Sequence, residues 1–81
     1  MTDRRASEAI KKIWISILKV DQIRPDDDFF ELGGTSMVGN HMLAVVRNEI
    51  GVRVRVRDLL ENPTLADFSD CVHALIDNPP A

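Results

Sequence analysis

The sequence lacks several features that would place it in a specialised class of protein. It has one cysteine, Cys71, so an internal disulfide is excluded. It has no apolar run long enough to span a membrane and nothing that resembles a signal peptide, so the compartment we expect is a reducing cytoplasm. It has no basic excess: acidic residues outnumber basic ones by 13 to 10, and the net charge of −3 argues against nucleic acid as a partner.

What is present fits one small globular domain. The chain has 81 residues, of which 44% are apolar and 28% charged, and it shows no repeats or low-complexity tracts. We expect a single domain over residues 1–81, with a folded core over about 6–77 and a frayed tail over 78–81. Met1 and the proline-rich tail fit a free-standing protein, although an excised domain would show the same ends.

Two segments carry apolar residues at the spacing of an amphipathic helix. The first helix is predicted over about residues 6–19, with the stripe Ile10, Ile13, Trp14, Ile17 and Leu18. The last helix begins after Thr64, which with Asp67 resembles a capping box. Its stripe consists of Leu65, Phe68, Val72, Leu75 and Ile76.

A further helix is predicted over residues 37–50, which are largely apolar and contain no proline. Gly51 lies where a glycine commonly ends a helix. Either Thr35 or Ser36 is expected to be the N-cap. A long loop separates this helix from the first one.

The alternating segment "VRVRVR", residues 52–57, has no partner strand, so we interpret it as an extended connector. Its valines are expected to face the core and its arginines the solvent. Residues 58–61 are predicted to form one helical turn, which ends before Pro63. The predicted fold is therefore an all-α four-helix bundle with three longer helices, one short helix and a long loop between helices one and two.

An enzyme with Ser36 as its nucleophile is the first functional alternative. The α/β-hydrolase elbow needs a glycine two residues to either side of the serine, and Gly34 fits while Val38 does not. The serine also needs a base, but His41 would lie about 140° around the helix. His73 is distant in sequence, and a chain this short offers little pocket. A role for Ser36 as a helix cap alone is the stronger local interpretation.

No metal site is predicted. An EF-hand loop that starts at Asp26 would need a glycine at its sixth position and a glutamate at its twelfth, where this chain has Glu31 and Met37. Cys71 and His73 are two residues apart on a helix, hence on nearly opposite faces. We expect Cys71 to be a small, buried or half-buried residue.

The stretch "DDDFFELGGTSM", residues 26–37, resembles the signature D-x-F-F-x-L-G-G-x-S-[LM] of carrier proteins that bear 4'-phosphopantetheine. The chain is most similar to the peptidyl carrier (thiolation) group of nonribosomal peptide synthesis. The first helix with its tryptophan and the segment "GVRVRVRDLLENPTLADF", residues 51–68, extend the resemblance over nearly the whole chain. Fatty-acid carriers usually have aspartate before the serine, where this chain has Thr35.

The resemblance implies a function as well as a four-helix bundle. Ser36 would carry 4'-phosphopantetheine, derived from coenzyme A, whose thiol holds aminoacyl, peptidyl or acyl units as thioesters. The protein would be a non-catalytic monomer. Its partners would be a phosphopantetheinyl transferase, an adenylation enzyme or domain, and a condensation or tailoring enzyme, but neither nucleic acid nor a membrane. The alternatives are an acyl carrier protein of polyketide or fatty-acid type and a helical interaction module that is never modified.

The surroundings of Ser36 support these expectations. The free amides at a helix N-terminus favour a phosphodiester by roughly 0.3–1 kcal/mol at an exposed site. Gly33 and Gly34 are expected to leave an uncrowded approach. Three apolar residues, Phe29, Phe30 and Leu32, are expected to pin the loop on the bundle. The helix carries no formal charge from Met37 to Val46, and the expected partner-facing residues are Gly34, Thr35, Met37, Val38, Asn40 and His41.

Overall fold

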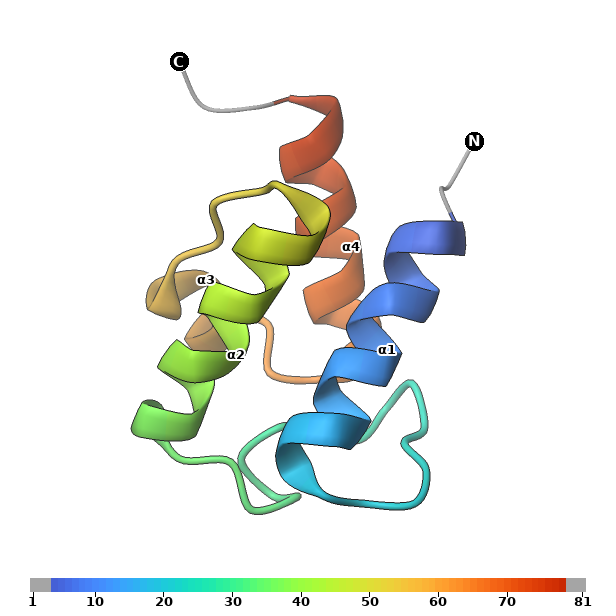
Figure 1. Cartoon of the computed structure of the whole chain (residues 1–81), viewed down its shortest axis with the longest axis vertical. Coiled ribbons are helices and arrows are strands. Elements are labelled where there is room, and N and C mark those ends of the chain that lie inside the picture. The colour runs from blue at the N-terminus through green and yellow to red at the C-terminus, as the bar shows by residue number, and fades with distance from the viewer. Residues whose placement is uncertain (1–3, 79–81) are drawn as a thin grey trace.

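The computed structural model describes residues 4–78 and contains four α-helices (Figure 1). They are α1 (Arg4–Leu18), α2 (Ser36–Ile50), α3 (Val56–Glu61) and α4 (Leu65–Asp77). Over residues 4–78 no strand occurs, only an isolated bridge between Asp28 and Thr64. The prediction of an all-α protein with three longer helices and one short helix is confirmed.

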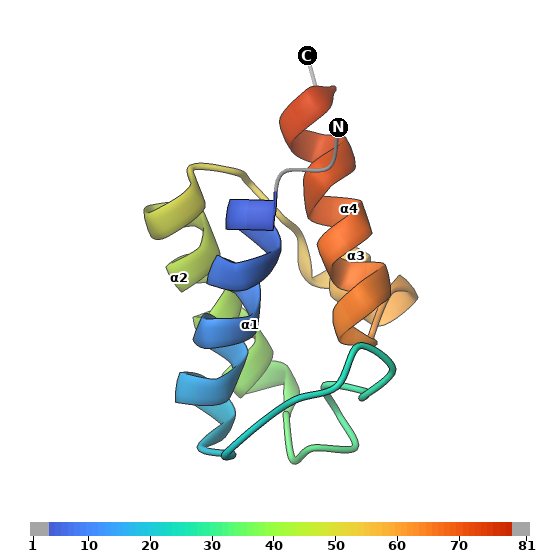
Figure 2. The same ribbon diagram turned by 90° about the vertical axis from the view of Figure 1, so that its right-hand side faces the viewer.

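The helices form a bundle around one apolar core. α1 packs against α2 and α4, and the short α3 joins α2 to α4, as the two orthogonal views show (Figures 1 and 2). Trp14 of α1 lies at the centre, with its ring 5.1 Å from that of Phe29 and 5.5 Å from that of Phe68. The other buried core residues are Ile10, Ile13, Ile23, Met42, Leu43, Val46, Val54, Leu59, Leu65 and Val72.

The ends of α2 follow local signals. The Thr35 hydroxyl accepts a hydrogen bond from the Val38 amide at 3.2 Å, so Thr35 is the N-cap and Ser36 the first helical residue. Gly51 ends the helix in the left-handed conformation, with φ of +82°, and donates its amide to the Arg47 carbonyl at 3.0 Å. The predicted end at Ile50 is confirmed.

The termini of the described chain differ slightly from the prediction. α1 begins at Arg4 rather than residue 6 and ends at Leu18. Asn78 is the C-cap of α4, because its amide donates to the Ala74 carbonyl at 2.8 Å. The remaining residues of the tail predicted to be frayed, 79–81, lie outside the described residues.

The boundary predicted for the short helix was wrong by two residues. α3 begins at Val56, not Asp58, so the extended connector is shorter than the alternating pattern. The Asp58 carboxylate accepts a hydrogen bond from the Arg55 amide at 3.0 Å, which favours a helix start at that point. The inward direction of the valines is confirmed, because Val54 is buried and Val52 packs on the core.

The long loop between α1 and α2 is held against the start of α4 (Figure 2). The Phe29 amide donates to the Pro63 carbonyl at 2.8 Å. In the other direction, the Leu65 amide donates to the Asp27 carbonyl at 3.1 Å, and the Ala66 amide donates to the Pro25 carbonyl at 2.8 Å. The loop therefore satisfies two amides that α4 cannot satisfy itself.

Candidate functional site

Ser36 is exposed at the first position of α2, where the long loop ends. Its own amide and that of Met37 have no acceptor in the part of the chain that the structure describes. These two N–H groups and the helix macrodipole give the site a partial positive charge. The arrangement fits an anionic group attached to the Ser36 hydroxyl.

The two glycines before Ser36 have different roles. Gly33 is exposed and has φ of +101°, a conformation that other residues rarely adopt, and nothing lies within 4 Å of where its Cβ would be. Gly34 is buried against Phe29, whose carbonyl accepts its amide at 3.0 Å. A Cβ on Gly34 would overlap the Phe29 ring and lie 2.7 Å from the Phe29 carbonyl oxygen.

The prediction that Gly34 widens the approach and faces a partner was therefore wrong. Its missing side chain makes room for the Phe29 ring inside the protein, because the loop passes directly over that ring. Phe29 itself is completely buried, while Phe30 and Leu32 are half-buried against the core. All three residues thus anchor the loop, as the sequence indicated.

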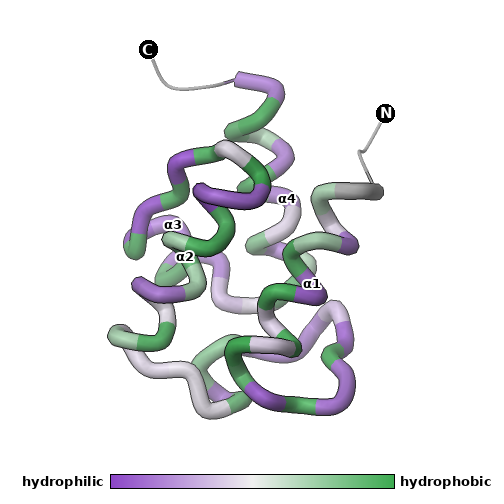
Figure 3. The backbone as a smooth tube through the Cα atoms, viewed as in Figure 1, coloured by the Kyte–Doolittle hydropathy of each residue, from purple (hydrophilic) through white to green (hydrophobic). Residues whose placement is uncertain are grey.

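The predicted partner face is mostly exposed. Thr35, Asn40 and His41 are accessible, and 83% of Met37 is exposed, which is unusual for a large apolar residue. Val38 is half-buried and packs on the core. Figure 3 shows that the backbone over residues 32–39, from the end of the loop into the first turn of α2, carries no strongly hydrophilic residue.

Gly39 has a structural role that the sequence analysis missed. A Cβ at this position would lie 3.0 Å from Cδ2 of Leu59 and 3.6 Å from Cε1 of Phe29. The missing side chain of Gly39 therefore allows α3 to approach α2 closely. This close packing offsets the lower helix propensity of glycine relative to alanine. A glycine near the start of an apolar helix was the only signal in the sequence.

The histidines do not form a base for Ser36. His41 is exposed on α2, and no hydrogen bond joins it to Ser36 within residues 4–78. His73 lies on α4, and its Nε2 is 3.3 Å from the hydroxyl oxygen of Ser7 on α1. Among the described residues, no histidine is hydrogen-bonded to Ser36 as the hydrolase alternative would require.

Cys71 is half-buried on α4. Desolvation by burial, followed by the negative charges of Asp58 and Glu61, raises the pKa of its thiol. The thiol consequently stays protonated near neutral pH, unlike a reactive cysteine. The structural role predicted for this residue agrees with these surroundings.

The described residues contain no group of three or more histidine, cysteine, aspartate or glutamate side chains that could hold a metal ion. None of their helices combines the length and the apolar character that crossing a membrane requires.

A family model described as "Phosphopantetheine attachment site" matches residues 8–72. The chain belongs to this family. Among curated relatives, surfactin synthase subunit 1 of Bacillus subtilis is 34% identical over 65 residues, or 80% of this chain and 2% of the relative. Bacitracin synthase 3 of Bacillus licheniformis is 32% identical over 75 residues, or 93% of this chain and 1% of the relative. The chain thus spans only a small part of these proteins.

Solved structures show the same fold. BlmI, a type-II acyl-carrier-protein from Streptomyces verticillus involved in bleomycin biosynthesis, has a TM-score of 0.83 at 33% identity, covering 90% of this chain and 88% of BlmI. A structure named as a non-ribosomal PCP domain has a TM-score of 0.71 at 28% identity, covering 80% of this chain and 83% of that domain.

These matches confirm the resemblance predicted from the sequence. The chain is a thioester-tethering carrier protein of the peptidyl carrier (thiolation) type. Its family carries a covalently attached 4'-phosphopantetheine.

Proposed function

We propose that Ser36 is the residue to which 4'-phosphopantetheine is attached. The observation that carries the proposal is the exposed hydroxyl at the first position of α2, beside two amides without acceptors, within the matched residues 8–72. These amides and the macrodipole would stabilise the phosphodiester oxygens. When bound, the prosthetic group supplies the thiol on which an acyl unit is carried.

We further propose that the units are aminoacyl, peptidyl or acyl groups in nonribosomal peptide or hybrid peptide-polyketide synthesis. The support is the set of peptide synthetases among the relatives, such as those of surfactin and bacitracin. The tether would raise the concentration of the unit at each partner's active site. The second candidate for the carried units is acyl groups of the kind held by acyl carrier proteins, because BlmI, which is named a type-II acyl-carrier-protein, matches over 88% of its length.

The protein would perform no catalysis itself. Because no base is hydrogen-bonded to Ser36 among the described residues, a phosphopantetheinyl transferase would activate the hydroxyl. An adenylation enzyme or domain and a condensation or tailoring enzyme would then load and use the unit. This cycle would take place in the cytoplasm, where coenzyme A is available, with the carrier acting as a monomer or as one domain of a longer chain.

Incubation with coenzyme A and a permissive phosphopantetheinyl transferase tests the attachment residue. Intact mass spectrometry should show the addition of one phosphopantetheine to the wild type and none to Ser36→Ala. Ser16→Ala, which removes an exposed hydroxyl on α1, should be modified like the wild type. An unmodified wild type, or addition to Ser36→Ala, would contradict the proposal.

Met37→Asp tests the partner face. Because the side chain is 83% exposed, the substitution should leave the stability unchanged or slightly raised, since an acid near a helix N-terminus is favourable. The kcat/KM of the transferase should fall about tenfold, as for an apolar anchor at the centre of an interface. The initial rate of modification measures the effect on kcat/KM, and urea unfolding measures the effect on stability.

Two controls accompany Met37→Asp. Ala44→Asp places the same charge at an exposed position farther along α2 and should retain the wild-type rate. Val38→Asp should lower stability as well as rate, because Val38 packs on the core. Equal rates for Met37→Asp and the wild type would show that Met37 contacts no transferase.

A further inference from the structure

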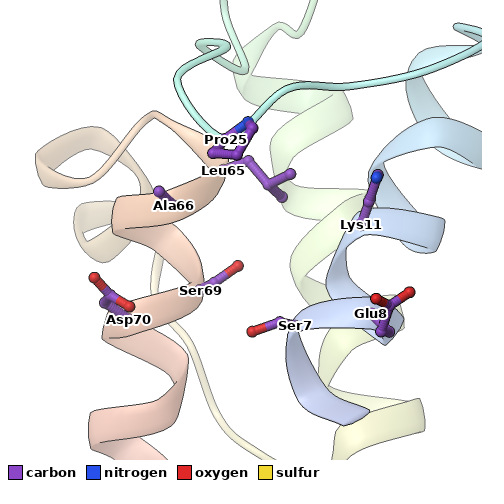
Figure 4. A pocket seen from close by; sticks show the side chains of 8 residues that line it. All are labelled: Ser7, Glu8, Lys11, Pro25, Leu65, Ala66, Ser69 and Asp70. Atoms are coloured by element: carbon purple, nitrogen blue, oxygen red, sulfur yellow. The ribbon is translucent and has the colours of Figure 1, made fainter. Parts of the chain in front are cut away.

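A cavity of about 230 Å³ lies between α1 and α4, apart from Ser36 (Figure 4). Its walls come from the first half of α1, the first half of α4 and Pro25 of the long loop. No residue of α2 and none of residues 26–35 lines it. The cavity is therefore separate from the attachment site and its partner face.

Ser69 is the observation that points to a ligand. Only 7% of this residue is exposed, and its hydroxyl points into the cavity toward Ser7 (Figure 4). No hydrogen bond to that hydroxyl occurs within the described residues, whereas the Ser7 hydroxyl already contacts Nε2 of His73 at 3.3 Å. The hydroxyl oxygen is not one of the fully buried atoms that lack a partner, so it is accessible from the cavity. It can therefore accept a hydrogen bond from a bound group.

The rest of the lining combines an apolar end with an acidic rim. Leu65 and Pro25 form the apolar end, while Glu8 and Asp70 stand on either side of the serine pair (Figure 4). Lys11 also lines the cavity, so two carboxylates stand against one ammonium group. Among the described side chains, residues 6–78, the only ion pair joins Arg57 and Glu61, so no described cation pairs with either rim carboxylate. The rim therefore favours a cation.

The volume decides the size of the ligand. Pockets that hold whole small molecules have volumes of about 300–1,000 Å³. The cavity of about 230 Å³ is smaller, and it suits a single long side chain. An arginine side chain has an apolar stem, a weakly hydrated cation and several N–H donors.

We propose that the cavity between α1 and α4 binds the arginine side chain of a partner's peptide segment. The stem packs on Leu65 and Pro25, and the guanidinium lies between Glu8 and Asp70 and donates to the Ser69 hydroxyl. Because α2 does not take part, this segment binds while the Ser36 face is in use by an enzyme. The proposal does not depend on the identity of the attachment residue.

The test is an NMR titration of the ¹⁵N-labelled protein with the peptide acetyl-Gly-Arg-Gly-amide. The backbone amides of Ser7, Leu65 and Ser69 should show saturable shifts. The matched peptide with citrulline has nearly the same shape without the charge, and it should bind at least about fivefold more weakly. Equal shifts with both peptides, or shifts spread over all acidic residues, would overturn the proposal.

Two variants assign the binding to this cavity. Asp70→Asn, at an exposed position that leaves the fold intact, should weaken binding of the arginine peptide about twofold to fivefold. Asp77→Asn, at the end of the same helix, should have no effect. Ser69→Ala should also weaken binding, and if this variant does not fold, Asp70→Asn still decides the question. Wild-type affinity in Asp70→Asn would refute the site.

Discussion

Replacing Phe29 with alanine is expected to lower the free energy of unfolding by about 3–5 kcal/mol. Phe29 is completely buried, and its ring makes an edge contact with Trp14 at 5.1 Å between centroids and one with Phe30 at 5.5 Å. The ring also fills the space beside Gly34 and Gly39. Since small domains have a total stability of about 5–15 kcal/mol, this loss would leave a substantial unfolded population.

Urea unfolding followed by far-UV circular dichroism measures the effect of Phe29→Ala. Fluorescence of Trp14, the only tryptophan in the chain, gives a second probe next to the substituted ring. The control is Phe30→Ala, which removes a neighbouring ring that is only half-buried and should cost clearly less. Equal losses for the two variants would contradict the central place of Phe29 in the core.

Adding a single methyl group at Gly34 should produce the second large effect. A Cβ there overlaps the Phe29 ring and lies 2.7 Å from the Phe29 carbonyl oxygen, so Gly34→Ala should cost about 1–3 kcal/mol as an overpacked site. The loop would have to move to make room for the methyl group. This movement would displace Ser36, which lies two residues after Gly34. We therefore expect slower modification by the transferase even under conditions in which the variant is folded.

A double-mutant cycle shows whether the ring is the cause. In the Phe29→Ala background the space is empty, so Gly34→Ala should cost less than in the wild type, with a coupling of about 0.5–3 kcal/mol. Gly33→Ala is the matched control, because its cost comes from the positive φ and nothing lies near its Cβ. Coupling as large for Gly33 as for Gly34 would show that backbone strain explains both.

The short-range features of this fold could be predicted from the sequence. The stripe that includes Ile10 and Trp14 identified α1, and the stripe that includes Phe68 identified α4, because helical periodicity is a local property. Gly51 marked the end of α2 for the same reason. The start of α3 was missed because the alternating valines are compatible with a strand, and the Asp58 hydrogen bond to the Arg55 amide decides otherwise.

The glycines show where local reasoning stops. The sequence predicted that Gly33 and Gly34 both leave an open approach to Ser36, and it predicted no packing role for Gly39. Only the packing reveals that Phe29 occupies the space beside Gly34, and that Leu59, twenty residues farther along the chain, occupies the space beside Gly39. Steric requirements of this kind depend on the approach of distant segments.

The sequence by itself determined the helices, the carrier family and the candidate serine, because periodicity, capping and the motif around Ser36 are all written in consecutive residues. The tertiary structure alone decided which glycine is buried and which side chains of α2 remain accessible. It alone brought Ser7 next to His73 and opposite Ser69, since these residues are more than sixty positions apart and meet only when α1 packs on α4.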